Sequence, residues 1–251
     1  IYKKIIISQF IKPLFYTLPN MYKLIVVFTL LFTYSFSQNN NVIGVVDNNF
    51  SYDSIVYVKA RANADYSTAI NALYYMMAKK PYRSIAYKDS LTCIYYLTQA
   101  YQKCILIGNE VLSHQPDNLH IMERVAISER LVGNIKSSLE MYEKLYLKTT
   151  SLVHAYYIAE MQFYLQRYGE CMTTLEKIIS SENSKNEKIE LTVNSKSKQM
   201  VSLAAAALNI KGMAYNELGK KDAAKEAFKS ALLLEKDFIL PKSNLEQLGK
   251  K

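Results

Sequence analysis

The residue types that most often carry chemistry are scarce in this sequence, and they are not spaced for it. Its 3 histidines, His114, His120 and His154, form no pair at the spacing of metal ligands, and neither His-Glu-x-x-His nor Cys-x-x-Cys occurs. Isolated histidines of this kind are more often surface or groove residues than ligands. The sequence therefore predicts no metal site and no metal cofactor.

The 3 cysteines are the next candidates for chemistry. Cys104 and Cys171 fall at small-residue positions of predicted helices, where a buried thiol packs as a compact apolar side chain. Cys93 lies on a neighbouring predicted helix, and a Cys93–Cys104 bridge would require side chains from different helix faces to meet. We therefore expect three unpaired thiols, with a catalytic or redox cysteine as the alternative.

The glycines also give no sign of a reaction centre. The 7 glycines form no phosphate-binding cluster, and the sequence has no Gly-x-Ser-x-Gly nucleophile motif. An enzyme with a helical body remains an alternative class, but it would need a cluster of titratable groups in one cleft. We expect no catalytic site and no cofactor-binding site.

The composition favours an all-helical fold with a substantial core. The chain has 251 residues, 50% of them hydrophobic, with Gly 7 and Pro 5, and dipeptides that mark β-turns are nearly absent. Aromatic residues are mainly Tyr (21), which fills helical cores and also occurs at interfaces, so their abundance alone does not decide the function.

The most regular stretch runs over residues 208–232, LNIKGMAYNELGKKDAAKEAFKSAL. Apolar and small residues at helical spacing predict a helix over 203–218, which Gly219 ends because a position just past a helix often requires a positive φ. A second helix is predicted over 222–235, with Asp222 in its first turn. The order and spacing of Gly212, Gly219 and the following small residues resembles the tetratricopeptide repeat (TPR), a helical hairpin of about 34 residues.

Further copies are predicted upstream from the small residue of each second helix. Taking Ala224 as the marker, its equivalents are Ala69, Cys104, Ser138 and Cys171, at successive separations of 35, 34, 33 and then 53 residues. Glu129 and Gln162 stand where the last copy has Tyr215, so copies three and four are degenerate or the register slips by one residue. The resemblance implies a right-handed superhelical solenoid of about five antiparallel helical hairpins.

The predicted boundaries follow from this register. The solenoid is expected over 54–240, with residues 180–198 as a flexible insertion because they are polar, charged and rich in Ser and Asn. Residues 241–251 are expected to form a C-terminal capping helix, and residues 38–53 a linker.

Residues 1–37 are predicted to be a signal and targeting segment. Met21-Tyr22-Lys23 is a short basic start, and residues 24–34 form an uncharged run too short to span a bilayer alone. Small residues at 35–37 predict cleavage near Gln38, with an uncleaved N-terminal anchor as the alternative. Residues 1–20 are interpreted as upstream of a true start at Met21. The expected location is exported, periplasmic or envelope-associated, with no stable membrane span once the signal is cleaved.

The charge distribution does not predict nucleic-acid binding. Taking the four lysines of residues 1–37 from the 31 basic residues leaves 27 against 22 acidic ones, a net charge of +5 instead of +9. Basic and acidic residues are interspersed along the predicted helices, as in Glu226/Lys229 and Glu140/Lys144, which is typical of solvated faces.

The family resemblance implies that the first helices of the hairpins line a concave inner surface where a protein or peptide ligand lies. The residues that match this inner row are Asp89, Cys93, Tyr96, His120, Glu123, Ile127, Arg130, Tyr156, Glu160, Phe163, Tyr164, Asn209, Met213, Asn216 and Glu217. Aromatic residues mixed with a few charges suit an interface with buried anchors and a polar rim. The alternative places Tyr156, Phe163 and Tyr164 in the core between repeats.

The predicted function is a non-catalytic scaffold that binds another protein or peptide in the cell envelope or periplasm. The alternative is a sensor or docking module of a larger membrane-associated envelope assembly. A groove for C-terminal carboxylates is not expected, because the inner row holds Arg130 among acids and no basic cluster.

Overall fold

The computed structural model describes residues 52–194 and 197–249. The predicted signal segment, residues 1–37, lies outside the described residues, as does the linker up to its last two positions. The first helices of the hairpins are α3 (Tyr52–Ala62), α5 (Ser84–Leu97), α7 (Leu119–Leu131), α9 (Leu152–Tyr164) and α12 (Leu203–Glu217). The second helices are α4 (Tyr66–Lys79), α6 (Tyr101–His114), α8 (Ile135–Thr149), α10 (Tyr168–Ser180) and α13 (Lys221–Leu234).

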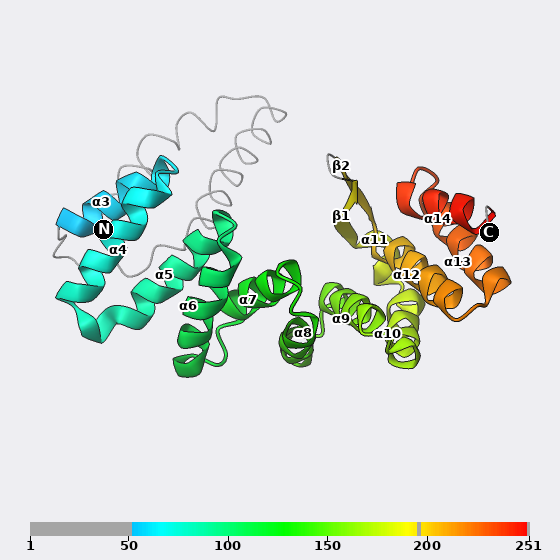
Figure 1. Ribbon diagram of the computed structural model, residues 1–251, viewed down its shortest axis with the longest axis horizontal. Coiled ribbons are helices and arrows are strands. Elements are labelled where there is room, and N and C mark those ends of the chain that lie inside the picture. The colour runs from blue at the N-terminus through cyan, green and yellow to red at the C-terminus, as the bar shows by residue number, and fades with distance from the viewer. Residues whose placement is uncertain (1–51, 195–196, 250–251) are drawn as a thin grey trace, which may run out of the picture. The chain divides into compact units, whose positions relative to one another are not determined.

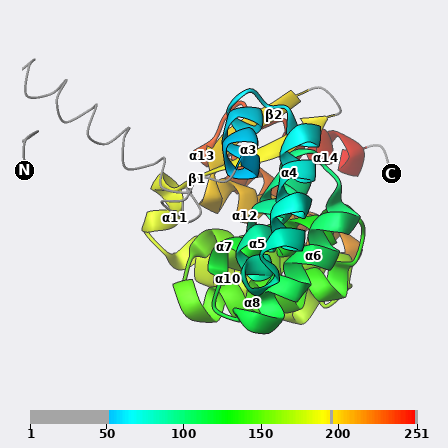
Figure 2. The same ribbon diagram turned by 90° about the vertical axis from the view of Figure 1, so that its left-hand side faces the viewer.

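The five helix pairs follow one another in chain order (Figure 1). Each second helix packs against its own first helix, and α4, α6, α8 and α10 also pack against the first helix of the next pair. Seen from the end that carries α3 and α4, the later pairs lie behind the first (Figure 2). Because a single amphipathic hairpin cannot bury its apolar face alone, this sequential packing is what gives the unit a core.

The turn inside each hairpin has the same backbone geometry in all five pairs. One residue per turn has a positive φ, and these residues are Ala64, Gln99, Gly133, Gln166 and Gly219. In the last turn, the Gly219 N–H donates to Asn216 O and the Lys220 N–H to Tyr215 O, the bonding pattern of a Schellman motif. Glycine fits this left-handed conformation, whereas glutamine and alanine adopt it at an energetic cost.

Replacing Gln99 or Gln166 by glycine is therefore expected to raise the free energy of unfolding. Relief of left-handed strain contributes about 1–2 kcal/mol and the extra freedom of glycine in the unfolded chain offsets part of it, leaving about 0.5–1 kcal/mol. Urea denaturation of the single variants measures the change, and Gly219→Ala is the reciprocal control, expected to destabilise by about 1 kcal/mol. If the Gln99→Gly variant were less stable than the unmodified protein, the inferred backbone strain at Gln99 would be wrong.

The predicted marker residues are all buried inside the helix pairs. Ala69, Cys104, Ser138, Cys171 and Ala224 are each the fourth residue of a second helix, and each has 0% of its surface exposed. Two of them also bond across the hairpin: Ser138 Oγ donates to Ala126 O (2.9 Å) and Cys171 Sγ to Ala159 O (3.3 Å). A larger side chain at these positions would separate the helices.

The prediction of an all-α fold is wrong in one segment. Between α10 and α12, a short helix α11 (Asn183–Asn186) is followed by strands β1 (Lys188–Asn194) and β2 (Ser197–Ser202), which pair antiparallel. The described residues of the expected flexible insertion thus lie mostly in α11 and the β-hairpin, and the fold is mostly helical. Ile189 and Val201 are a cross-strand pair and both are buried in the core, which explains why the hairpin is ordered despite its polar composition.

The β-hairpin is also fastened to the C-terminal end of the unit. Gln199 Nε2 donates to Asp237 O (2.8 Å), and Gln199 Oε1 accepts from the Ile239 N–H (3.0 Å), at the start of α14 (Ile239–Gly249). Glu235 accepts from the Ser202 N–H and pairs with Lys188. One 3₁₀ helix, η1 (Pro81–Arg83), links α4 to α5. Among the described residues, no helix has the length and apolar character needed to cross a membrane.

Candidate functional site

The structure places the predicted partner-binding residues on α5, α7, α9 and α12, the first helices of pairs two to five. We call these residues the inner row. They do not form one uniform surface: polar groups gather on α7 and α9, a second polar group lies on α5 and α7, and a pocket lies beside α12.

Three inner-row predictions do not hold as surface contacts, and the first of them, Cys93, is 3% exposed. Tyr156 is 3% exposed and belongs to the core shared with α10 and α12, while Asn209 is buried and accepts a hydrogen bond from Asn244 Nδ2 on α14 (3.0 Å). Successive helical residues point about 100° apart. The predicted position on α9 is therefore off by one residue: Tyr156 points into the core, and its neighbour Tyr157 lies beside Arg130. Ile127 is half-buried and packs against the core around α8.

The polar centre of the inner row is an ion pair between α7 and α9. Arg130 Nη1 lies 3.5 Å from Glu160 Oε2, and the two side chains are 27% and 17% exposed. Burial raises the pKa of the Glu160 carboxyl, and the nearby Arg130 guanidinium lowers it again in part. The pair is incompletely satisfied, because Arg130 Nε and Glu160 Oε2 are buried without a hydrogen-bond partner among the described residues.

Aromatic rings form the wall behind this ion pair. The Arg130 guanidinium lies over the Tyr157 ring, 5.1 Å from its centroid, and Tyr157 stacks on Tyr142 of α8 with centroids 4.9 Å apart. Tyr142 is fully buried, and burial raises the pKa of its hydroxyl far above the usual value. The cation–π contact and the stack restrict the conformations open to Arg130.

A second contact between α7 and α9 lies about two helical turns away. His154 Nε2 is 3.7 Å from Glu123 Oε1, and His154 Nδ1 is 2.8 Å from Thr149 Oγ1 at the end of α8. The nearby His154 imidazole is the main reason that the pKa of Glu123 is lowered. Sequence reasoning did not assign His154 or Tyr157 to the inner row. The signal was present, because Tyr157, Glu160 and Tyr164 have the i, i+3, i+7 spacing of one helix face.

The second polar group joins α5 to the start of α7. Asp89 accepts from Asn118 Nδ2 (2.8 Å), and Asn118 also caps α7 by accepting from the Ile121 N–H (3.2 Å). His120 Nδ1 lies 2.6 Å from an Arg124 guanidinium nitrogen, and that guanidinium lies 5.6 Å from the Tyr96 ring centroid. Burial and the Arg124 charge lower the pKa of His120, so His120 is uncharged at neutral pH.

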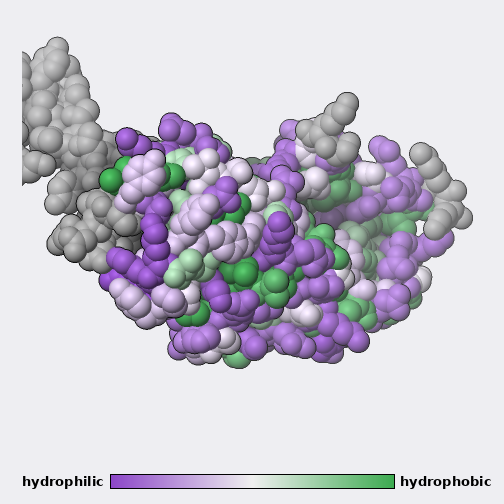
Figure 3. Space-filling view, turned by 60° about the vertical axis from the view of Figure 1, so that its left-hand side comes forward, coloured by the Kyte–Doolittle hydropathy of each residue, from purple (hydrophilic) through white to green (hydrophobic). Residues whose placement is uncertain are grey.

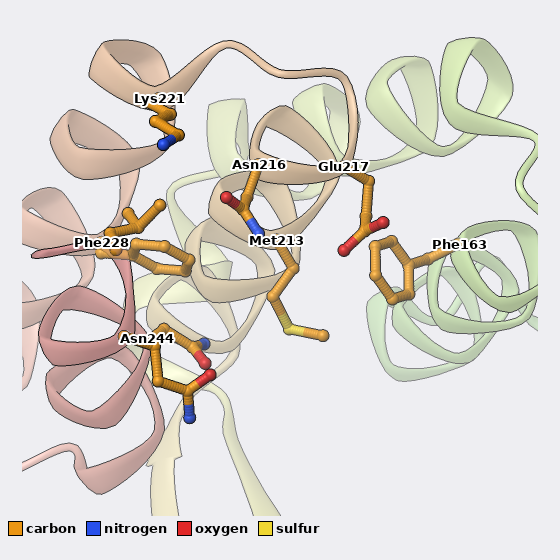
Figure 4. A pocket seen from close by; sticks show the side chains of 9 residues that line it. Phe163, Met213, Asn216, Glu217, Lys221, Phe228 and Asn244 are labelled. Atoms are coloured by element: carbon orange, nitrogen blue, oxygen red, sulfur yellow. The ribbon is translucent and has the colours of Figure 1, made fainter. Parts of the chain in front are cut away.

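A pocket of about 220 Å³ opens between the ends of α9, α12 and α14 (Figure 4). Four predicted inner-row residues line it, Phe163, Met213, Asn216 and Glu217, together with Lys221 and Phe228 of α13. The remaining wall comes from α14, through Asn244, Gln247 and Leu248. The lining is therefore mixed, with five polar or charged side chains and four apolar ones, so the pocket can make both polar and apolar contacts with part of a ligand.

The described residues offer little for catalysis. Cys93, Cys104 and Cys171 are unpaired and buried, and burial raises the pKa of all three thiols, that of Cys171 to about 12. These thiols are protonated at neutral pH, whereas the thiolate is the nucleophile. In residues 52–194 and 197–249, no group of three His, Cys, Asp or Glu side chains is arranged to hold a metal ion.

Five sequential antiparallel helix pairs with one shared turn geometry define a TPR-like helical repeat protein. No protein-family model matches the sequence, and no curated protein sequence matches it either. Solved structures do match. The crystal structure of MamA protein superimposes with a TM-score of 0.58 at 15% identity, covering 73% of this chain and 90% of that chain. YrrB, described as a TPR protein with an unusual peptide-binding site, gives 0.61 at 9% identity, covering 76% and 88%. At these identities the likeness shows the fold, and the predicted resemblance is confirmed at that level.

Proposed function

We propose that this chain is a non-catalytic scaffold that binds a protein or peptide segment along the inner row. The observation that carries the proposal is the continuity of the row: half-buried and exposed aromatic and charged side chains follow one another over four successive first helices. Anchoring aromatics within a polar rim are typical of protein interfaces. The likeness in fold to YrrB, a TPR protein with a peptide-binding site, agrees with this proposal.

The proposal includes a right-handed superhelical course of the helix pairs, which would bring the first helices to the concave side. Packing of each second helix on the next first helix supports this, because a small constant rotation per repeat produces a superhelix. The partner would then lie lengthwise across α5, α7, α9 and α12.

A protein partner fits the surface charge better than a nucleic acid does. Several basic side chains on the helices are paired with acids, as in Lys79–Asp53, Lys148–Asp117 and Lys229–Glu226. On the face shown in Figure 3, hydrophilic residues separate small hydrophobic patches. A nucleic-acid site would be expected to show clustered, unpaired basic residues.

The test is site-specific photocrosslinking in cells that produce the full chain. A photoreactive phenylalanine analogue replaces Tyr164, which is 56% exposed on α9, and in a matched control it replaces Leu147, which is 81% exposed on the second helix α8. We expect a discrete protein adduct from position 164 and none from position 147. Equal adducts from both positions, or none from 164, would contradict the proposal.

Charge reversal at Glu123 or Arg130 is a poorer test, because these residues hold His154 and Glu160.

We also propose that the protein is exported to the periplasm or cell envelope. The support is the sequence of residues 21–37, with its basic start, its uncharged run and the small residues that follow. Fractionation of the producing cell, with N-terminal sequencing of the mature chain, tests this. A start near Gln38 in the envelope fraction is expected, and a cytoplasmic chain that keeps residues 24–34 would contradict export.

A further inference from the structure

Glu217 differs from the other acidic residues of the inner row because it has no partner in the described part of the chain. Asp89 accepts a hydrogen bond from Asn118, Glu123 lies beside His154, and Glu160 lies beside Arg130. The Glu217 side chain makes no hydrogen bond and no ion pair within residues 52–194 and 197–249, and it is exposed at the pocket. The row thus carries one free negative charge, and it lies at the mouth of the pocket.

The neighbours of Glu217 suit a cation with an apolar stem. Figure 4 shows its carboxylate beside the Phe163 ring, with the Met213 side chain reaching into the space below them. A guanidinium group can stack on an aromatic ring while its N–H groups bond to a carboxylate. The methylene groups of the same side chain can pack on a thioether such as that of Met213.

The size of the pocket limits what enters it. Sites for whole drug-sized ligands measure about 300–1,000 Å³, and a cavity of about 150 Å³ holds benzene. A volume of about 220 Å³ therefore fits one large side chain and not a whole small-molecule cofactor.

We propose that this pocket binds an arginine side chain of the partner, with Glu217 as its counter-ion, Phe163 as its stacking surface and Met213 as the wall for its stem. The proposal rests on the proposed function, since the arginine belongs to a peptide lying along the inner row. Lys221 is the opposing charge at the rim. Figure 4 shows Lys221 on the other side of Asn216 from Glu217, so its amino group leaves the carboxylate side of the pocket free.

The probe is N-acetyl-arginine amide, titrated into the full chain carrying ¹³C-methyl methionine. The Met213 methyl signal, assigned with Met213→Leu, is expected to shift saturably at millimolar probe. The neutral isostere N-acetyl-citrulline amide is expected to bind about fivefold more weakly, because it lacks the charge. Glu217→Gln should reduce arginine affinity by about the same factor, and Glu226→Gln, an exposed acid on α13 paired with Lys229, should leave it unchanged.

Three outcomes would overturn the arginine proposal: equal affinity for the arginine and citrulline probes, tighter binding of N-acetyl-leucine amide, or no Met213 shift at tens of millimolar. The first two would leave a pocket for an uncharged or apolar anchor. These failures are separable from failure of the proposed function, because the adduct at position 164 does not depend on the pocket. If that adduct were absent while the pocket still bound the arginine probe, the scaffold proposal would be wrong and arginine binding by the pocket would stand.

Discussion

Replacing Gly212 by alanine is expected to lower the free energy of unfolding by about 2 kcal/mol. A Cβ at this position would lie 2.4–2.8 Å from three atoms of the Phe228 ring. Phe228 lies on the partner helix α13 and is 1% exposed, so a methyl group at position 212 would have to displace a packed ring. Overpacking costs about 1–3 kcal/mol, and three contacts shorter than 3.0 Å put this site at the upper end of that range. The better helix propensity of alanine offsets about 1 kcal/mol, which leaves a net loss of about 2 kcal/mol.

The matched control is Gly169→Ala on α10. A Cβ there meets nothing within 4 Å, so alanine should leave stability unchanged or raise it by up to about 0.5 kcal/mol. Chemical denaturation of both variants gives the comparison. If Gly212→Ala were as stable as Gly169→Ala, the close approach of α12 and α13 would be wrong, and with it the packing that positions Met213 and Glu217.

Removing the positive member of the central ion pair is expected to have an effect of similar size. Arg130→Met leaves the Glu160 carboxylate largely buried without its counter-ion, which should destabilise the protein by about 2–3 kcal/mol at pH 7. Breaking a fully buried ion pair usually costs about 3–5 kcal/mol, and the loss expected here is smaller because both side chains keep some exposure. Arg130→Met/Glu160→Leu should recover most of the loss, because it removes both charges.

The pH dependence of Arg130→Met follows from the sign of the Glu160 shift. Burial raises the folded-state pKa of Glu160 above the unfolded value of 4.5, and loss of Arg130 removes the factor that lowers it. The folded variant therefore holds a proton that the unfolded chain has released, and its stability falls as pH rises from about 4.5 through the folded pKa. Denaturation at pH 5 and pH 7.5 should show the larger deficit at pH 7.5. An equal deficit at both pH values would mean that Glu160 is not desolvated.

Much of the repeat architecture was predictable because one position is constrained in every hairpin. The small marker residue is needed where two helices approach most closely, so its spacing survives where other repeat residues differ. The register also resolves the doubt raised by Glu129 and Gln162, which lie four residues before the positive-φ residue, as Tyr215 does. Both are buried and use polar contacts instead of a ring: Glu129 accepts from Asn134 and Gln162 from Thr174.

The β-hairpin was not predicted, because the polar composition of the segment was given more weight than its alternating pattern. Ser, Asn and Lys suggested a flexible insertion, but Ile189, Leu191 and Val193 alternate with polar residues at the period of a strand. Its burial also depends on Glu235 and Asp237, which lie more than 30 residues away in sequence, and no local pattern could give that contact.

The sequence predicted which helices carry the inner row, but it predicted less well which residues on those helices are accessible. The family resemblance indicated the correct helices. Deciding whether Tyr156 or Tyr157 faces the core requires knowing how far α9 is rotated about its axis. That rotation is set by packing against α8 and α12, through Tyr142 and the core around Tyr156. The absence of a partner for Glu217 among the described residues is likewise a property of its three-dimensional placement.

The central claim is that partners bind to the first helices and not to the second. Photocrosslinking at six positions tests it most directly: Tyr96, Tyr164 and Met213 on first helices, against Leu106, Leu147 and Leu233 on second helices. The three second-helix positions are well exposed, so accessibility does not favour the expected result. The account predicts adducts to one partner from the first-helix positions alone. Adducts to that partner from the second-helix positions, with none from the first, would contradict it.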